Sequence, residues 1–126
     1  MYESLTITVT CEGFGAADTE LEDFSLAYSD AEALEEQVAE LADMDSLINL
    51  ISEYCEGYPK ELIDAGKSDR FVDALRSMDF KKLKTLEFNY FTSDFEAPVE
   101  DPPLETTTNL AYDFETKSAT YDYSED

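Results

Sequence analysis

The sequence contains no histidine, and it has few basic residues for its length. Histidine is the side chain whose ordinary pKa best suits proton transfer near neutral pH, and it is the usual partner of serine or cysteine nucleophiles. A glycine-rich phosphate loop is missing too, because Gly13-Phe14-Gly15 has neither the lysine ending nor the spacing of such motifs. We therefore expect a protein that is not an enzyme and that has no cofactor.

Metal sites are not indicated either. The absence of histidine removes the commonest ligand of transition metals. The acidic segments 18–23 and 43–45 do not continue with the glycine and terminal glutamate of an EF-hand calcium loop. The two cysteines, Cys11 and Cys55, lack the paired spacing of a zinc site or a redox motif, so we expect two buried, reduced thiols.

Long apolar runs are also missing. No stretch approaches the roughly 18 consecutive apolar residues of a membrane span, and the first residues lack the basic start of a signal peptide. We therefore expect a cytoplasmic protein that has no membrane partner. The hydrophobic fraction of 43% is nevertheless too high for a disordered acidic tail, so the sequence predicts one folded domain over 1–126.

What the sequence has in excess is negative charge. It contains 31 acidic residues against 8 basic ones, which gives a net charge of −23. No base occurs before Lys60, and Lys117 is the only base after Lys84. A chain of this charge is repelled by nucleic acid and by anionic membranes, and it attracts basic proteins.

Alternating apolar and polar residues predict strands toward both ends of the chain. Leu5, Ile7 and Val9 alternate with threonines, which is typical of a half-buried strand over 5–11. An acidic connection over 18–23 and a second short strand over 24–28 are expected to follow.

The C-terminal third predicts further strands and a long loop. Residues 86–90 alternate as a strand, and Pro98, Pro102 and Pro103 mark a long acidic loop at about 92–108. Two more alternating runs lie around 110–114 and 119–123, and they predict a terminal hairpin.

Helical spacing of apolar residues fills the middle of the chain. Ser29 and Glu32 form a capping-box pattern at the start of a helix over about 30–42. A second helix follows, with Asp45 or Ser46 as its cap. Two more are predicted, a short one opened by Pro59 and one capped by Ser68 or Asp69 that carries Phe71, Val72, Leu75 and Met78.

This order of elements predicts an α+β fold. We expect a small antiparallel sheet of three to five strands with three or four helices packed on one face. The terminal hairpin would give the sheet an exposed edge, through which a homodimer could form.

The helix over 30–42 concentrates acidic residues on one side. Leu34, Val38 and Leu41 occupy its apolar side, and glutamates gather on the other. These acids are spaced at roughly 4 Å along the helix axis, comparable with the ~3.4 Å axial spacing of phosphates along one DNA strand. A solvated face made from good helix formers would give the same pattern, so both interpretations stay open.

Acidic residues before Lys60 and in the long loop form the candidate partner-binding set, which has no catalytic or metal-binding member. The residues are Glu20, Glu22, Asp23, Asp30, Glu32, Glu35, Glu36, Glu40, Asp43, Asp45, Asp94, Glu96, Glu100 and Asp101.

In charge and composition the chain resembles the acidic DNA-mimic inhibitors of phages and plasmids, which include anti-restriction and anti-CRISPR proteins. The resemblance rests on overall character and on no specific motif. It implies a non-catalytic inhibitor whose carboxylates occupy the basic channel of a CRISPR effector, restriction enzyme or other nucleic-acid-acting protein in the host cytoplasm.

Other interpretations of the acidity remain open. The chain could be an immunity protein that neutralises a basic nuclease toxin. It could also be a halophile-type protein without a basic partner, or an acidic chaperone-like module. The aromatic residues Tyr112, Phe114, Tyr121 and Tyr123 could be core strand residues or partly exposed anchors.

Overall fold

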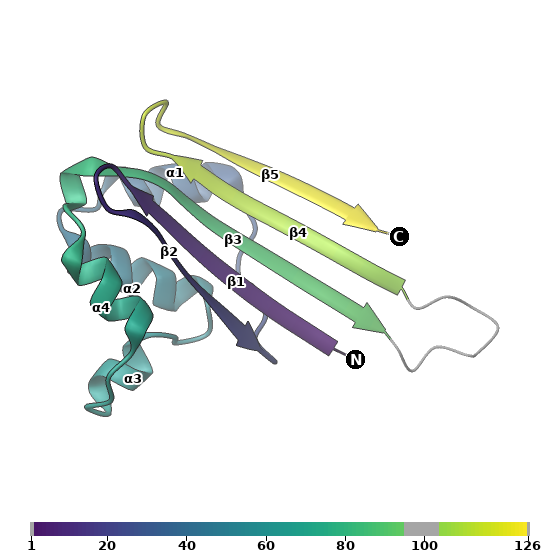
Figure 1. The fold of residues 1–126 in the computed structure, drawn as a ribbon. Helices are drawn as coiled ribbons and strands as arrows, with labels where there is room; N and C mark the ends of the chain where they lie inside the picture. The colour runs from purple at the N-terminus through teal and green to yellow at the C-terminus, as the bar shows by residue number, and fades with distance from the viewer. Residues whose placement is uncertain (1, 95–103, 126) are drawn as a thin grey trace.

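The computed structural model describes residues 2–94 and 104–125, which form an antiparallel sheet and four α-helices (Figure 1). The strands are β1 (Tyr2–Cys11), β2 (Gly15–Glu22), β3 (Leu83–Asp94), β4 (Leu104–Asp113) and β5 (Ser118–Glu125). The helices are α1 (Ala31–Ala39), α2 (Met44–Tyr54), α3 (Lys60–Asp64) and α4 (Arg70–Ser77), and a 3₁₀ turn, Phe80–Lys82, precedes β3. The predicted α+β class is confirmed.

The five strands lie in the order β2-β1-β3-β4-β5, and every neighbouring pair is antiparallel. The N-terminal strand therefore lies between β2 and β3, and all four helices are inserted in the chain between these two strands. One cross-strand row joins Ile7 to Phe88, Phe88 to Leu110, and Leu110 to Tyr121.

The hydrophobic core lies on one face of the sheet. The predicted strand over 5–11 is confirmed, with Leu5, Ile7 and Val9 fully buried. Core residues of the helices, such as Leu34, Leu47 and Leu75, belong to the same buried cluster. In Figure 1, α1 lies behind the strands, and α3 and α4 lie to the left of β2. Alternation along each strand therefore separates a helix-covered face from an open face.

The prediction of a second strand over 24–28 is wrong. The strand is β2, which includes most of the segment that we expected to be an acidic connection. Ala17 is buried and Leu21 half-buried, while the alternating acids point away from the core, an arrangement that an edge strand tolerates. The segment after β2 instead reaches the helices, where Ala27 N–H donates to the carbonyl of Tyr54 at the end of α2, at 2.9 Å.

Two predicted helix caps are also wrong by one to three residues. Asp30 caps α1, and its carboxylate accepts bonds from the N–H groups of Glu32 and Ala33. Asp43 caps α2, and Ser46 returns a hydrogen bond to the Asp43 backbone in a capping box. In each case an aspartate takes the cap position in place of a neighbour that could also have served. The other predicted helices are confirmed, with Asp69 as the cap of α4.

The C-terminal hairpin is confirmed as β4 and β5. Their register runs without interruption from Asp113 opposite Ser118 to Thr106 opposite Glu125. The loop predicted at about 92–108 is shorter than expected, because 92–94 belong to β3 and 104–108 to β4. The central part of that loop, 95–103, lies outside the described residues.

Both cysteines are free and buried, as predicted. Cys55 follows α2 and is fully buried. Burial, and to a smaller extent the nearby Glu56 carboxylate, together raise the pKa of its thiol to about 12. A thiol held neutral in this way is a poor nucleophile and a poor metal ligand.

Candidate acidic interaction surface

The outward side of α1 carries the most regular row of carboxylates. Leu34 and Val38 are buried against the sheet, and Glu32, Glu36 and Glu40 are exposed on the opposite side. Successive members are four residues apart, so they are spaced at about 6 Å along the helix. The sequence-based interpretation of this side as exposed and acidic is therefore correct for these three residues.

Three other acids of the predicted set have internal hydrogen-bonding roles. Asp30 and Asp43 cap α1 and α2. Glu35 is half-buried, and its Oε1 accepts a hydrogen bond from the backbone N–H of Ala119 in β5, at 2.7 Å. These carboxylates still contribute negative charge to the surface, but their oxygens accept hydrogen bonds from backbone N–H groups of the same chain. Asp45, in the first turn of α2, is exposed.

The acids of β2 lie on the open face of the sheet, away from α1. Glu20 and Glu22 are exposed and oppose Thr6 and Ser4 of β1. Asp23 follows the strand with a φ of 63°, and its N–H donates to the Glu3 carbonyl. The predicted set is thus divided between two faces, and the structure does not bring its members into one site.

The last four members of the predicted set cannot be assigned to either face. Asp94 ends β3, but its side chain is not among those described. Glu96, Glu100 and Asp101 lie outside the described residues.

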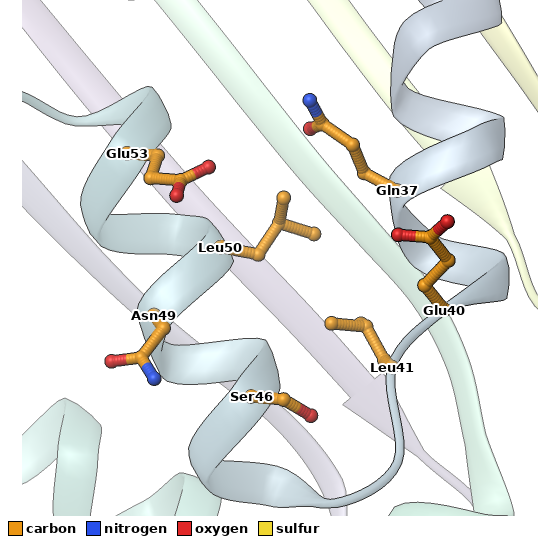
Figure 2. A pocket seen from close by; sticks show the side chains of 7 residues that line it. All are labelled: Gln37, Glu40, Leu41, Ser46, Asn49, Leu50 and Glu53. Atoms are coloured by element: carbon orange, nitrogen blue, oxygen red, sulfur yellow. The ribbon is translucent and has the colours of Figure 1, made fainter.

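A groove between α1 and α2 adds an acid that the sequence analysis missed. The groove has a volume of about 270 Å³, and Figure 2 shows side chains from both helices around it. Glu40 lines it from the end of α1 and Glu53 from the last turn of α2, with Leu41 and Leu50 between them. Gln37 reaches toward the groove, and its Oε1 is buried without a hydrogen-bond partner.

Both acids of this groove lie at helix ends that disfavour negative charge. The C-terminus of a helix carries partial negative charge, and cations there are stabilising. Neither α1 nor α2 has a base in its last turn, and Glu40 and Glu53 occupy these ends. One sequence signal could have identified Glu53 as a candidate: it is an acid near the end of a predicted helix that has no base in its last turn. Both placements cost the fold some stability.

The aromatic residues of the C-terminal hairpin divide between core and surface. Tyr112 is buried, and its ring meets that of Phe114 edge-on with 4.8 Å between centroids. Tyr121 and Tyr123 on β5 are 47% and 48% exposed. The core interpretation is therefore correct for Tyr112, and Tyr121 and Tyr123 are partly exposed.

Comparisons with known proteins add nothing to these observations. Searches against protein families, curated proteins and solved structures found no match to this chain. Within residues 2–94 and 104–125, no three acidic or cysteine side chains are grouped so that they could hold a metal ion. In the same part of the chain, no helix is long and apolar enough to cross a membrane.

Proposed function

We propose that this chain is a non-catalytic inhibitor that places carboxylates where a nucleic-acid-acting protein binds phosphates. Its target would be a basic channel, such as that of a CRISPR effector or a restriction enzyme. The observation that carries the proposal is the exposed row of Glu32, Glu36 and Glu40 on one side of α1. Asp45, in the first turn of α2, is a further exposed acid.

The positions of these acids support a functional origin over a solvated face. Like charges four residues apart each destabilise a helix by a few tenths of a kcal/mol, and Glu32, Glu36 and Glu40 contain two such pairs. Glu40 adds an unfavourable interaction with the helix end. A lysine at the exposed position of Glu36 would replace both repulsive pairs with attractive ones without disturbing the core.

The groove between α1 and α2 would receive a basic side chain of the target. Leu41 and Leu50 offer an apolar surface for the stem of an arginine or lysine. Glu40 and Glu53 lie on the two walls and would pair with the charged head. Such a contact would fix the orientation of the inhibitor, while the row on α1 supplies the long-range attraction.

The proposed mechanism is competition. Carboxylates attract the basic channel through solution and raise the association rate, which falls as salt screens the charges. The bound inhibitor then excludes the nucleic acid from the channel. No bond is made or broken in this scheme, and one inhibitor blocks one channel.

Two triple variants with the same change in net charge test the surface. One carries Glu32→Lys, Glu36→Lys and Glu40→Lys, and the control carries Asp18→Lys, Glu20→Lys and Glu22→Lys on the open face. Each immobilised protein is exposed to host lysate at low salt, and bound proteins are eluted with rising salt. The proposal predicts that wild type and control retain the same nucleic-acid-binding protein and that the α1 variant loses it. If both variants lose the bound protein equally, binding depends on net charge alone and not on the α1 surface.

A further inference from the structure

The free edge of β5 is the strongest unassigned feature of the described residues. β5 is the last strand of the order β2-β1-β3-β4-β5, and it pairs with β4 without a register shift. Its sequence, Ser118–Glu125, contains no proline, glycine, lysine or arginine. Proteins use proline, charged side chains (especially lysine) and bulges to prevent pairing at an edge; of these β5 has only the acids Asp122 and Glu125.

The hydrogen-bonding direction of this edge follows from Ala119. Its N–H donates to Glu35 of α1, at 2.7 Å. In an antiparallel pair, alternate residues direct both backbone groups to the same neighbouring strand. Because Ala119 directs its N–H away from β4, Tyr121 and Tyr123 also present their N–H and C=O groups at the free edge. Their side chains are half-exposed beside it.

We propose that two copies of this chain pair through β5, antiparallel, about a two-fold axis at Tyr121. The axis is perpendicular to the joined sheet, so residues directly opposite each other must belong to the same face. Only registers centred on a residue satisfy this condition, and centring on Tyr121 pairs nearly the whole strand. Ala119 then lies opposite Tyr123, so a small side chain accommodates a large one.

Charge selects this register over its neighbours. With the axis at Tyr121, Lys117, the last residue of the turn before β5, comes beside Glu125 of the second copy, and this contact occurs twice. An axis at Thr120 would move Lys117 away from Glu125 and beside Tyr123, and an axis at Asp122 would place Asp122 opposite itself. Like charges directly opposite are destabilising. Lys117 is the only base after Lys84, and it lies at the end of the turn that leads into β5.

The proposed dimer has two consequences. A perpendicular two-fold axis keeps the helix-covered faces on the same side, so α1 of both copies would face the same way. Each copy carries a net charge of −23, so the copies repel at long range and salt should strengthen the dimer. Glu35 must release Ala119 N–H to the second copy, so Glu35→Ala should favour pairing. This proposal is independent of the inhibitor function.

Sedimentation of the full chain over a range of concentrations and salt tests the dimer. Lys117→Glu or Glu125→Lys alone should weaken it by about tenfold, from two opposed like-charge pairs. The double variant should restore it, and Lys67→Glu, with the same charge change as Lys117→Glu, should have little effect. A monomer at every concentration and salt would overturn the proposal, as would a dimer insensitive to the Lys117 and Glu125 variants.

Cross-linking tests the position of the axis. Directly opposed residues have Cα atoms about 5.5 Å apart in a hydrogen-bonded pair, within the range of a disulfide. Tyr121→Cys should therefore oxidise to a covalent dimer, whereas Tyr123→Cys should do so much more slowly. Cys11 and Cys55 are buried and will not compete. Equal cross-linking of both variants would contradict the register.

Discussion

The hydroxyl of Tyr58 donates to the carboxylate of Asp69, with 2.9 Å to Oδ2 and 3.0 Å to Oδ1. The same Oδ1 accepts the N–H groups of Phe71 and Val72 at the start of α4. One carboxylate thus caps a helix and holds the ring that follows α2. Burial, first, and then the hydrogen bond to Asp69 raise the pKa of Tyr58 above its ordinary value.

Asp69→Ala should destabilise the protein more than Tyr58→Phe. The alanine loses the cap and leaves the Tyr58 hydroxyl without its partner, at a cost of about 2 kcal/mol. The phenylalanine loses one hydrogen bond, at about 1 kcal/mol. Denaturant unfolding measures both, with Asp73→Ala in the first turn of α4 as an exposed control. Equal losses of stability from the two substitutions would contradict this prediction, because they would mean that the Asp69 cap adds nothing beyond its bond to Tyr58.

Tyr54→Phe should leave stability unchanged or raise it by up to about 1 kcal/mol. The Tyr54 side chain is fully buried, and its hydroxyl has no hydrogen-bond partner. The ring itself is well placed, stacked on Phe88 at 5.3 Å between centroids. Phenylalanine keeps the ring and removes the unsatisfied group. Thermal unfolding checks this, and a loss of more than about 1 kcal/mol would mean that the hydroxyl is bonded.

Alkaline pH should destabilise the fold from about pH 9 upward. Burial raises the pKa of Cys55 from 9.0 to about 12, and burial followed by the Glu3 hydrogen bond raises that of Tyr90 from 10.0 to about 12. Between those values the folded state holds protons that the unfolded state has lost. Stability contributed by these groups is therefore present below the unfolded pKa and lost as pH rises through the folded pKa.

Urea unfolding at a series of pH values measures this decline. Tyr90→Phe removes one of the groups, so the fall between pH 10 and pH 12 should be shallower. A free energy of unfolding that stays constant across this range would contradict the assigned burial.

Glu40→Lys should stabilise the protein by about 0.5 kcal/mol at low salt. The substitution removes a negative charge from the C-cap of α1 and supplies the cation that this helix end lacks. The gain should shrink as salt is added. Glu40→Gln serves as the neutral control and should give a smaller gain. Destabilisation by the lysine would show that Glu40 has a favourable partner in the fold.

The helices and the central strands could be predicted because their apolar residues repeat with a clear period. Leu5, Ile7 and Val9 alternate along a strand, and Phe71, Val72 and Leu75 recur at helical spacing. Each pattern predicts which side of its element is buried. The choice between Ser29 and Asp30 as a cap could not be predicted, because either side chain can accept the same N–H groups.

β2 was missed because its sequence contradicts strand preference. Asp and Glu are depleted in strands, and Ala17 and Leu21 are the only apolar side chains of β2 on the core side, with the polar Thr19 between them. Its hairpin pairing with β1 supplies the hydrogen bonds and the core face that its own residues do not predict. The division of the acids between two faces follows from the same strand. The composition gives the number of acids, but only the fold shows that Glu20 lies on the open face of the sheet and Glu36 on the exposed side of α1.

Displacement of DNA is the measurement that tests the central claim most directly. The nucleic-acid-binding protein recovered by the chain is bound to labelled double-stranded DNA, and the release of DNA is followed by fluorescence anisotropy as the chain is added. We predict release by wild type that weakens steeply with salt, at least tenfold weaker release by the Glu32, Glu36 and Glu40 triple variant, and unchanged release by the Asp18, Glu20 and Glu22 control. DNA that stays bound at saturating wild-type chain would contradict the account.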